Sequence, residues 1–250
     1  MQPVEDMDQI VVNRARIDHQ THLHLRTSVV PILIYYNRQP ISGKPKDLSQ
    51  PAGLFPGIVT VSAGNFCHTC KYARASLFPR IPDLFRFEIL FPNGTTVDTR
   101  NIVVEQGETL TAFFVFGSIG DVNEVRFVDQ PVSRNHSIKM FGYYLSPFPP
   151  RLPISELCDG FASHPGDRFF RHDCTRSHIS ARGSAVFNDQ ERLVGISYER
   201  HGLTKALDVE GIRYELLQIY GGMNEMSILQ IVEHIRALGE VRAANLAGPS

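Results

Sequence analysis

A chain of 250 residues with 42% hydrophobic and 20% charged residues can bury a sizeable core, which excludes a disordered or fibrous protein. The 25 basic and 26 acidic residues give a formal net charge of -1, so no overall field favours a nucleic acid or a membrane surface as a partner. No apolar run approaches the roughly 20 residues of a membrane helix. Residues 1–9 lack the pattern of a secretory signal, so we expect a cytoplasmic or nuclear location.

The first half of the chain is predicted to consist of strands that follow a polar leader at residues 1–27. Strands are indicated by short apolar, β-branched and aromatic runs that turn residues bound. The strands predicted on this basis are residues 29–36, 57–62, 87–91, 95–104 and 109–116. The strongest signal is Asn93-Gly94, because Asn-Gly between two such runs is typical of a tight hairpin.

The second half continues with strands and ends in helices. Further strands are predicted at residues 122–128, 138–145, 185–187 and 193–198. The proline-rich stretch 147–153 is interpreted as a crossing between two halves. Helical periodicity follows at residues 209–220 and 226–238, and Gly239 is expected to end the second helix.

Two segments resemble trypsin-like serine proteases of the Deg/HtrA type. Residues 89–116, ILFPNGTTVDTRNIVVEQGETLTAFFVF, are similar to the family's stretch that leads into the catalytic aspartate. Residues 183–188 and 193–196, followed by 206–209, are similar to the segment around and after the nucleophile. The resemblance covers about residues 29–220.

The resemblance implies a mainly β fold of two six-stranded antiparallel barrels with C-terminal helices. The expected boundaries are 28–130 for the first barrel, 131–220 for the second, and 221–250 for a C-terminal helix and tail.

The resemblance also places Gly64, Thr109 and Arg182 where the family has its histidine, aspartate and serine. The mechanism needs a hydroxyl nucleophile, an imidazole base and a carboxylate that orients the base, and these three side chains supply none of them. An arginine is not deprotonated at neutral pH. The sequence therefore predicts a pseudoprotease that is not an enzyme, a protein-binding or regulatory module with a protein or peptide partner and no cofactor.

Three alternatives stay open at this point. His68 and Ser184 lie near the expected base and nucleophile, so a divergent serine hydrolase with a relocated nucleophile is one of them. The Cys-x-x-Cys pair at Cys67 and Cys70 is the basis of the second. With His172 and Cys174 it would hold zinc in a zinc-stabilised interaction module, against the simpler interpretation of reduced thiols. The third is a cationic cleft, formed by Arg182 with Arg176, His178 and His172, that binds a carboxylate or phosphate.

Overall fold

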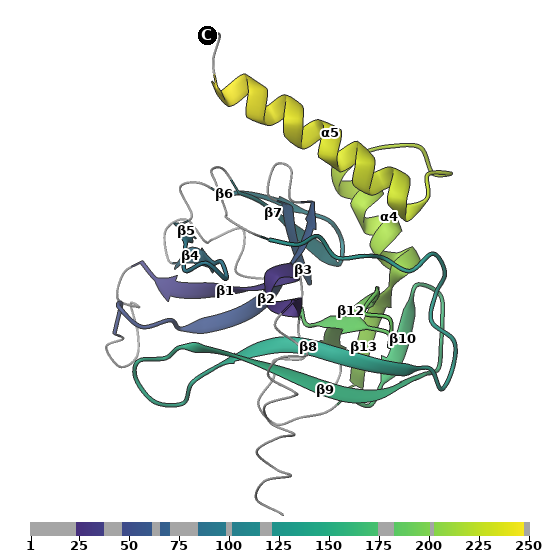
Figure 1. The fold of residues 1–250 in the computed structure, drawn as a ribbon, viewed down its shortest axis with the longest axis horizontal. Coiled ribbons are helices and arrows are strands. Elements are labelled where there is room, and N and C mark those ends of the chain that lie inside the picture. The colour runs from purple at the N-terminus through teal and green to yellow at the C-terminus, as the bar shows by residue number, and fades with distance from the viewer. Residues whose placement is uncertain are drawn as a thin grey trace, which may run out of the picture.

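The computed structural model of the chain describes residues 24–37, 47–61, 66–70, 85–98, 102–115, 122–174, 183–200 and 203–247. Within these ranges the chain forms an antiparallel sheet, a closed barrel and two C-terminal helices (Figure 1). The predicted mainly β class with C-terminal helices is thereby confirmed.

The first half forms a seven-stranded antiparallel sheet, called here the N-terminal sheet. A one-turn helix, α2 (Leu25–Ser28), precedes it. The strands are β1 (Val29–Tyr36), β2 (Gly53–Val61), β3 (Phe66–Cys70), β4 (Phe85–Leu90), β5 (Thr96–Asp98), β6 (Ile102–Gln106) and β7 (Leu110–Val115). Their order is β5-β4-β1-β2-β3-β7-β6, so the two ends of the sheet are consecutive strands.

This order requires the N-terminal sheet to curl on itself. Only residues 99–101 separate β5 from β6 in the sequence. Four steps of about 3.8 Å between successive Cα atoms therefore keep the end of β5 within roughly 15 Å of the start of β6. The sheet is therefore curved, with the end of β5 near the start of β6, although these two strands do not pair.

The second half forms a closed six-stranded barrel, called here the C-terminal barrel. Its strands are β8 (Ser137–Leu145), β9 (Pro153–Ser163), β10 (Phe169–His172), β11 (Ala185–Phe187), β12 (Leu193–Arg200) and β13 (Leu203–Asp208). They close in the order β10-β13-β12-β11-β8-β9. β8 and β9 form the long hairpin, paired from Ser137 with Phe161 to Leu145 with Pro153 (Figure 1).

Two predictions about the middle of the chain are wrong. The proline-rich stretch 147–153 does not cross between the two halves, since it forms the tip of the β8–β9 hairpin. A proline-rich segment suits a hairpin loop as well as a connection between two halves, because in neither case does its backbone have to donate hydrogen bonds to a neighbouring strand. The crossing is instead residues 122–128, predicted as a strand. Val125 donates to the Val59 carbonyl of β2 at 3.0 Å, and Leu193 of β12 donates to the Arg126 carbonyl at 2.6 Å.

Two cores fill the interiors of the sheet and the barrel. In β4, Phe85, Phe87 and Ile89 are buried and alternate with partly exposed residues, as a strand with one buried face requires. The rings of Phe55, Phe87 and Phe113 pack together with centroids 5.9 to 6.1 Å apart. The barrel interior is built from a second buried cluster: Val132, Ile138, Met140, Cys158, Ala162, Phe170, Cys174, Val186, Val194 and Ala206.

The C-terminal helices cover the junction of the two halves. α4 (Val209–Tyr220) matches its predicted range, and the Asp208 carboxylate caps it by accepting from the Gly211 amide at 2.8 Å. α4 packs against α5, β7, β12 and β13.

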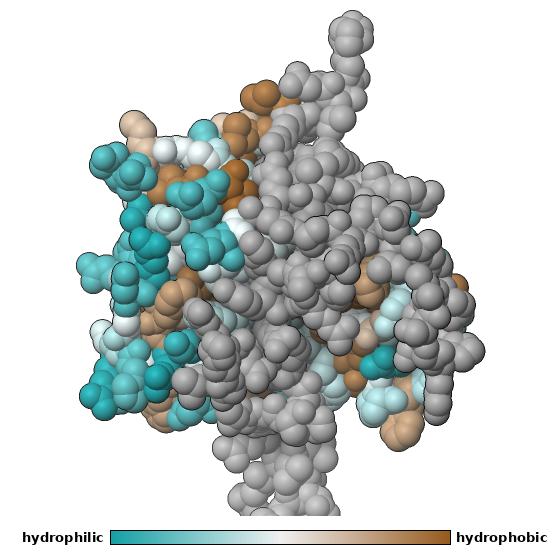
Figure 2. Space-filling view, turned by 180° about the vertical axis from the view of Figure 1, so that it is seen from behind, coloured by the Kyte–Doolittle hydropathy of each residue, from teal (hydrophilic) through white to brown (hydrophobic). Residues whose placement is uncertain are grey.

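The second helix, α5 (Ile228–Ala247), runs past the predicted stop at Gly239. Gly239 is buried there, and an interior glycine costs a helix only about 1 kcal/mol. Seen from behind, hydrophilic side chains cover much of the described surface and hydrophobic ones gather along α5 (Figure 2). No described helix is long and apolar enough to cross a membrane.

Candidate functional site

The turn between β6 and β7 carries Thr109, the residue predicted at the aspartate position. Thr109 is buried, with 6% of its surface exposed, and its backbone amide donates to Glu215 Oε2 at 2.8 Å. The next amide, of Leu110, donates to the same oxygen at 3.2 Å. The carboxylate at this turn therefore comes from α4 of the C-terminal half.

Glu215 is a residue that sequence reasoning missed. It is only 3% exposed, which is unusual for a glutamate unless it is paired. A Cβ on Gly107 would clash with its carboxylate, so the glycine in this turn leaves room for it. The only signal in the sequence was that Glu215 shares one helix face with the apolar Ile212 and lies next to Leu216.

Ser184, the fallback nucleophile, lies immediately before β11. Its carbonyl accepts from the Ser197 amide at 2.8 Å, and the Gly183 amide donates to the Ser197 carbonyl at 2.7 Å. Gly183 has a φ of 84°, in the left-handed region that glycine adopts without strain. Ser184 is fully buried, at 0% exposure, so its hydroxyl lies beneath the surface.

Several predicted site residues fall outside what the structure describes. Gly64 and Arg182, the predicted histidine and serine positions, lie outside the described residues, as do Arg176 and His178. The backbone of Cys67, His68 and Cys70 runs in β3, paired with β2 and β7, but their side chains lie outside the description. The roles predicted for these residues stay predictions.

The structure brings one described serine and histidine within hydrogen-bonding distance, and the pair was not predicted. His172 Nε2 lies 2.9 Å from Ser197 Oγ. His172 is 6% exposed and Ser197 is 0% exposed. Phe170, two residues before His172 on the same strand face, belongs to the barrel core, and its ring lies against Gly195, two residues before Ser197. The pair therefore lies inside the C-terminal barrel, where a peptide substrate has no access.

The environment of His172 favours the neutral imidazole. Burial lowers the pKa of His172 to about 4, against an opposing effect of the Asp173 carboxylate and of the Lys205 backbone. Nδ1 has no hydrogen-bond partner among the described residues. At neutral pH the ring is therefore uncharged, and its hydrogen bond to Ser197 fixes its position.

Two buried thiols share the same interior. Both Cys158 and Cys174 are buried, and burial, with Cys158 and Asp173 adding to it, raises the pKa of Cys174 to about 12. The thiolate that a metal would need is disfavoured there. The described residues contain no group of three or more histidine, cysteine, aspartate or glutamate side chains placed to hold a metal ion. The zinc set of Cys67, Cys70, His172 and Cys174 stays a prediction.

Solved structures identify the fold. Deg5 superposes with a TM-score of 0.59 at 14% sequence identity, covering 83% of this chain and 97% of that one. The serine endoprotease from Yersinia pestis superposes with a TM-score of 0.55 at 14% identity, covering 80% of this chain and 64% of that one. No protein-family model and no curated protein matches the sequence. The architecture is therefore the trypsin-like fold of HtrA-type serine proteases.

These neighbours correct the prediction that the chain is not an enzyme. The chain shares its fold with a serine endoprotease, and this protease fold contradicts that prediction. The prediction rested on three residue identities that were assigned by the resemblance of short motifs to the family. Two of these positions, Gly64 and Arg182, lie between described strands, and loops accept insertions that displace such a motif match.

Proposed function

We propose that this protease-fold chain binds an extended segment of a partner protein by adding it as a strand to the edge of β6. The observation that supports the proposal is the strand order. Every strand of the C-terminal barrel has two neighbours, whereas β6 ends the N-terminal sheet with β7 as its single partner among the described strands. An unpaired strand edge presents a row of backbone donors and acceptors to another chain.

The register of β6 identifies the backbone groups that would receive the partner. Gly107 donates to the Leu110 carbonyl at 2.9 Å, and Glu105 and Val103 stand opposite Ala112 and Phe114 in the same register. Hydrogen-bonded and non-hydrogen-bonded positions alternate in an antiparallel pair. The backbone amides and carbonyls of residues 103, 105 and 107 therefore point towards β7. The amides and carbonyls of 102, 104 and 106 therefore point to the open edge.

Proline substitution at one of these positions tests the proposal. The full chain would first be used to select binders from a displayed library of eight-residue peptides, and affinity would be measured by fluorescence anisotropy. Val104→Pro removes an outward amide and is expected to weaken binding at least tenfold, while Val104→Thr keeps the amide and serves as the matched control. Gln106→Pro is a second variant at the same edge. Both prolines should fold, since edge strands accept proline where the amide faces outward.

Equal affinity of the parent chain, Val104→Pro and Gln106→Pro for the selected peptides would contradict binding at this edge. Val103→Pro provides an internal check on the register. Its amide faces β7, so this variant is expected to lower the thermal unfolding temperature clearly below that of Val104→Pro.

Peptide-bond hydrolysis is a second candidate function, and the likeness of the fold to a serine endoprotease favours it. The residues proposed for it are His68 as base and Ser184 as nucleophile, and the buried Ser184 would have to become accessible when a substrate binds. A serine-directed fluorophosphonate is then expected to label the chain, and Ser184→Ala and His68→Ala are each expected to abolish the label. An absence of labelling, or a label that persists in Ser184→Ala, would reject this candidate.

A further inference from the structure

A cavity of about 410 Å³ lies where α2, the β4–β5 turn and the β8–β9 hairpin meet. Its volume is within the range of small-molecule sites, roughly 300–1,000 Å³. The walls are mostly apolar and conformationally restricted, and they consist of Pro31, Leu90, Phe91, Pro92 and Pro153, joined by Gly94. The shape and lining suit the apolar part of a small ligand.

Arg26 is the charged residue in the cavity lining. It is half-buried, and in the described part of the chain no carboxylate forms an ion pair with it. Arg213 and Arg236, by contrast, each pair with a glutamate. A half-buried guanidinium with no anionic partner in this part of the chain favours an anionic ligand.

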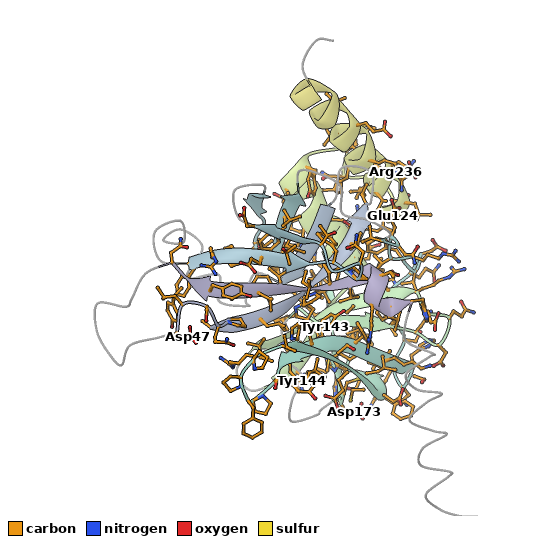
Figure 3. All side chains as sticks on the ribbon, turned by 60° about the vertical axis from the view of Figure 1, so that its left-hand side comes forward. Asp47, Glu124, Tyr143, Tyr144, Asp173 and Arg236 are labelled. Atoms are coloured by element: carbon orange, nitrogen blue, oxygen red, sulfur yellow. The ribbon has the colours of Figure 1, made fainter. Side chains whose placement is uncertain are left out.

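The other two polar side chains of the lining already have partners. The Tyr143 hydroxyl donates to the Val29 carbonyl at 2.6 Å, which holds the ring between the sheet and the barrel (Figure 3). Thr27 Oγ1 donates a hydrogen bond to the His24 carbonyl at 2.5 Å and accepts one from Asn123 Nδ2 at 2.7 Å. Burial raises the pKa of Tyr143, and the positive charge of Arg26 acts against that rise. The guanidinium of Arg26 therefore interacts electrostatically with another residue of the cavity lining. Arg26 is therefore the polar group left to bind a ligand.

We propose that this cavity binds an apolar carboxylate, with its acid group on Arg26 and its hydrocarbon part against Leu90, Phe91 and the prolines. Two sources share this chemistry: the C-terminus of a polypeptide whose last residues are apolar, and a medium-chain fatty acid. No residue of β6 lines the cavity, so the inference stands apart from the strand-addition proposal.

Calorimetric titration of the full chain with two matched pairs of compounds tests the proposal. The first pair is N-acetyl-Leu-Leu with a free carboxylate and the same peptide as its C-terminal amide. The second pair is octanoate and octanamide. Each acid that binds is expected to bind about tenfold to a hundredfold more tightly than its amide, which is the range of a charge-assisted hydrogen bond. Binding of only one acid identifies the source of the carboxylate.

Variants connect the binding to the cavity. Arg26→Gln is expected to remove the preference for acid over amide, and Arg26→Lys to retain most of it. Arg134→Gln, at an exposed arginine outside the lining, is the matched control and should bind as the parent chain does. Leu90→Trp fills the cavity and should weaken both members of a pair.

Three results would overturn the proposal. They are no binding of either acid at millimolar concentration, equal binding of acid and amide, and an acid preference that survives Arg26→Gln. Thermal unfolding of each variant accompanies the titrations, and Arg26→Gln should fold because the guanidinium makes no described ion pair.

Discussion

At the scale of single residues, polar contacts in the interior join residues that lie on different elements of the chain. Glu215 bonds the Thr109 and Leu110 amides across more than a hundred residues, and His172 bonds Ser197 inside the barrel. Sequence reasoning singled out Thr109 and His172 as positions. It could not predict their hydrogen-bond partners, because the sequence around a polar residue does not show whether its side chain faces solvent or another buried polar group.

Replacing Glu215 tests whether its hydrogen bonds hold α4 against the β6–β7 turn. Glu215→Leu leaves the buried Thr109 and Leu110 amides without their acceptor, which is expected to cost about 1–3 kcal/mol per orphaned group in the free energy of unfolding. Glu215→Gln keeps one oxygen and should cost less. Urea unfolding measures both. Glu210→Gln, which breaks an ion pair with Arg213 on the surface of the same helix, is the control and should change stability by less than about 1 kcal/mol.

A smaller loss in Glu215→Leu than in Glu210→Gln would show that the buried carboxylate does not hold the turn.

His172 predicts a dependence of stability on pH. Its pKa is lowered in the folded state from 6.5 to about 4, so between these values the unfolded chain takes up a proton that the folded chain does not. The neutral ring's contribution is present above pH 6.5, declines as the pH falls, and is lost by about pH 4. It amounts to about 3 kcal/mol at 1.36 kcal/mol per pKa unit.

Unfolding measurements from pH 7 to pH 4 check this expectation. His172→Gln should flatten the decline, and His136→Gln, at an exposed histidine, is the matched control. An unchanged decline in His172→Gln would assign the acid sensitivity to other groups.

At the scale of elements, strands with strong local signals were predictable. The Asn93-Gly94 hairpin is confirmed, since β4 and β5 pair from Glu88 with Asp98 to Leu90 with Thr96. The helix at 209–220 is confirmed as well. The predictions failed at 122–128 and 147–153, where local composition is compatible with either a strand or a connection. Only pairing partners elsewhere in the chain decide between the two.

The Asn93-Gly94 turn offers a test at this scale. Gly94 has a φ of 83°, and no atom lies within 4 Å of where its Cβ would be. The cost of Gly94→Ala is therefore conformational rather than steric, and we expect a loss of about 1 kcal/mol in the free energy of unfolding. Gly166→Ala is the control, because that glycine has no left-handed φ and a Cβ there would make only an ordinary contact. A loss in Gly166→Ala as large as that in Gly94→Ala would contradict the assignment.

At the scale of the whole molecule, the two halves differ in closure. The C-terminal strands form a closed barrel, whereas the N-terminal strands form a sheet with two edge strands. Every strand of the C-terminal barrel is paired on both sides, while β5 and β6 are the edge strands of the N-terminal sheet. The resemblance predicted two six-stranded barrels. The N-terminal sheet has seven strands because β3 was not predicted, the predicted strand 95–104 is divided into β5 and β6, and residues 122–128 form the crossing instead of a strand. α5 joins the halves from outside, where Arg236 pairs with Glu124 of the crossing segment at 2.6 Å (Figure 3).

From the strand order and register we propose that a partner strand binds at the outward amides of β6. Hydrogen exchange at single amides measures this most directly, with and without a selected peptide bound. The account predicts that the amides of Val104 and Gln106 exchange quickly in the free chain and become strongly protected in the complex, while that of Val103 is protected in both. A bound peptide that leaves the exchange of Val104 and Gln106 unchanged would contradict it.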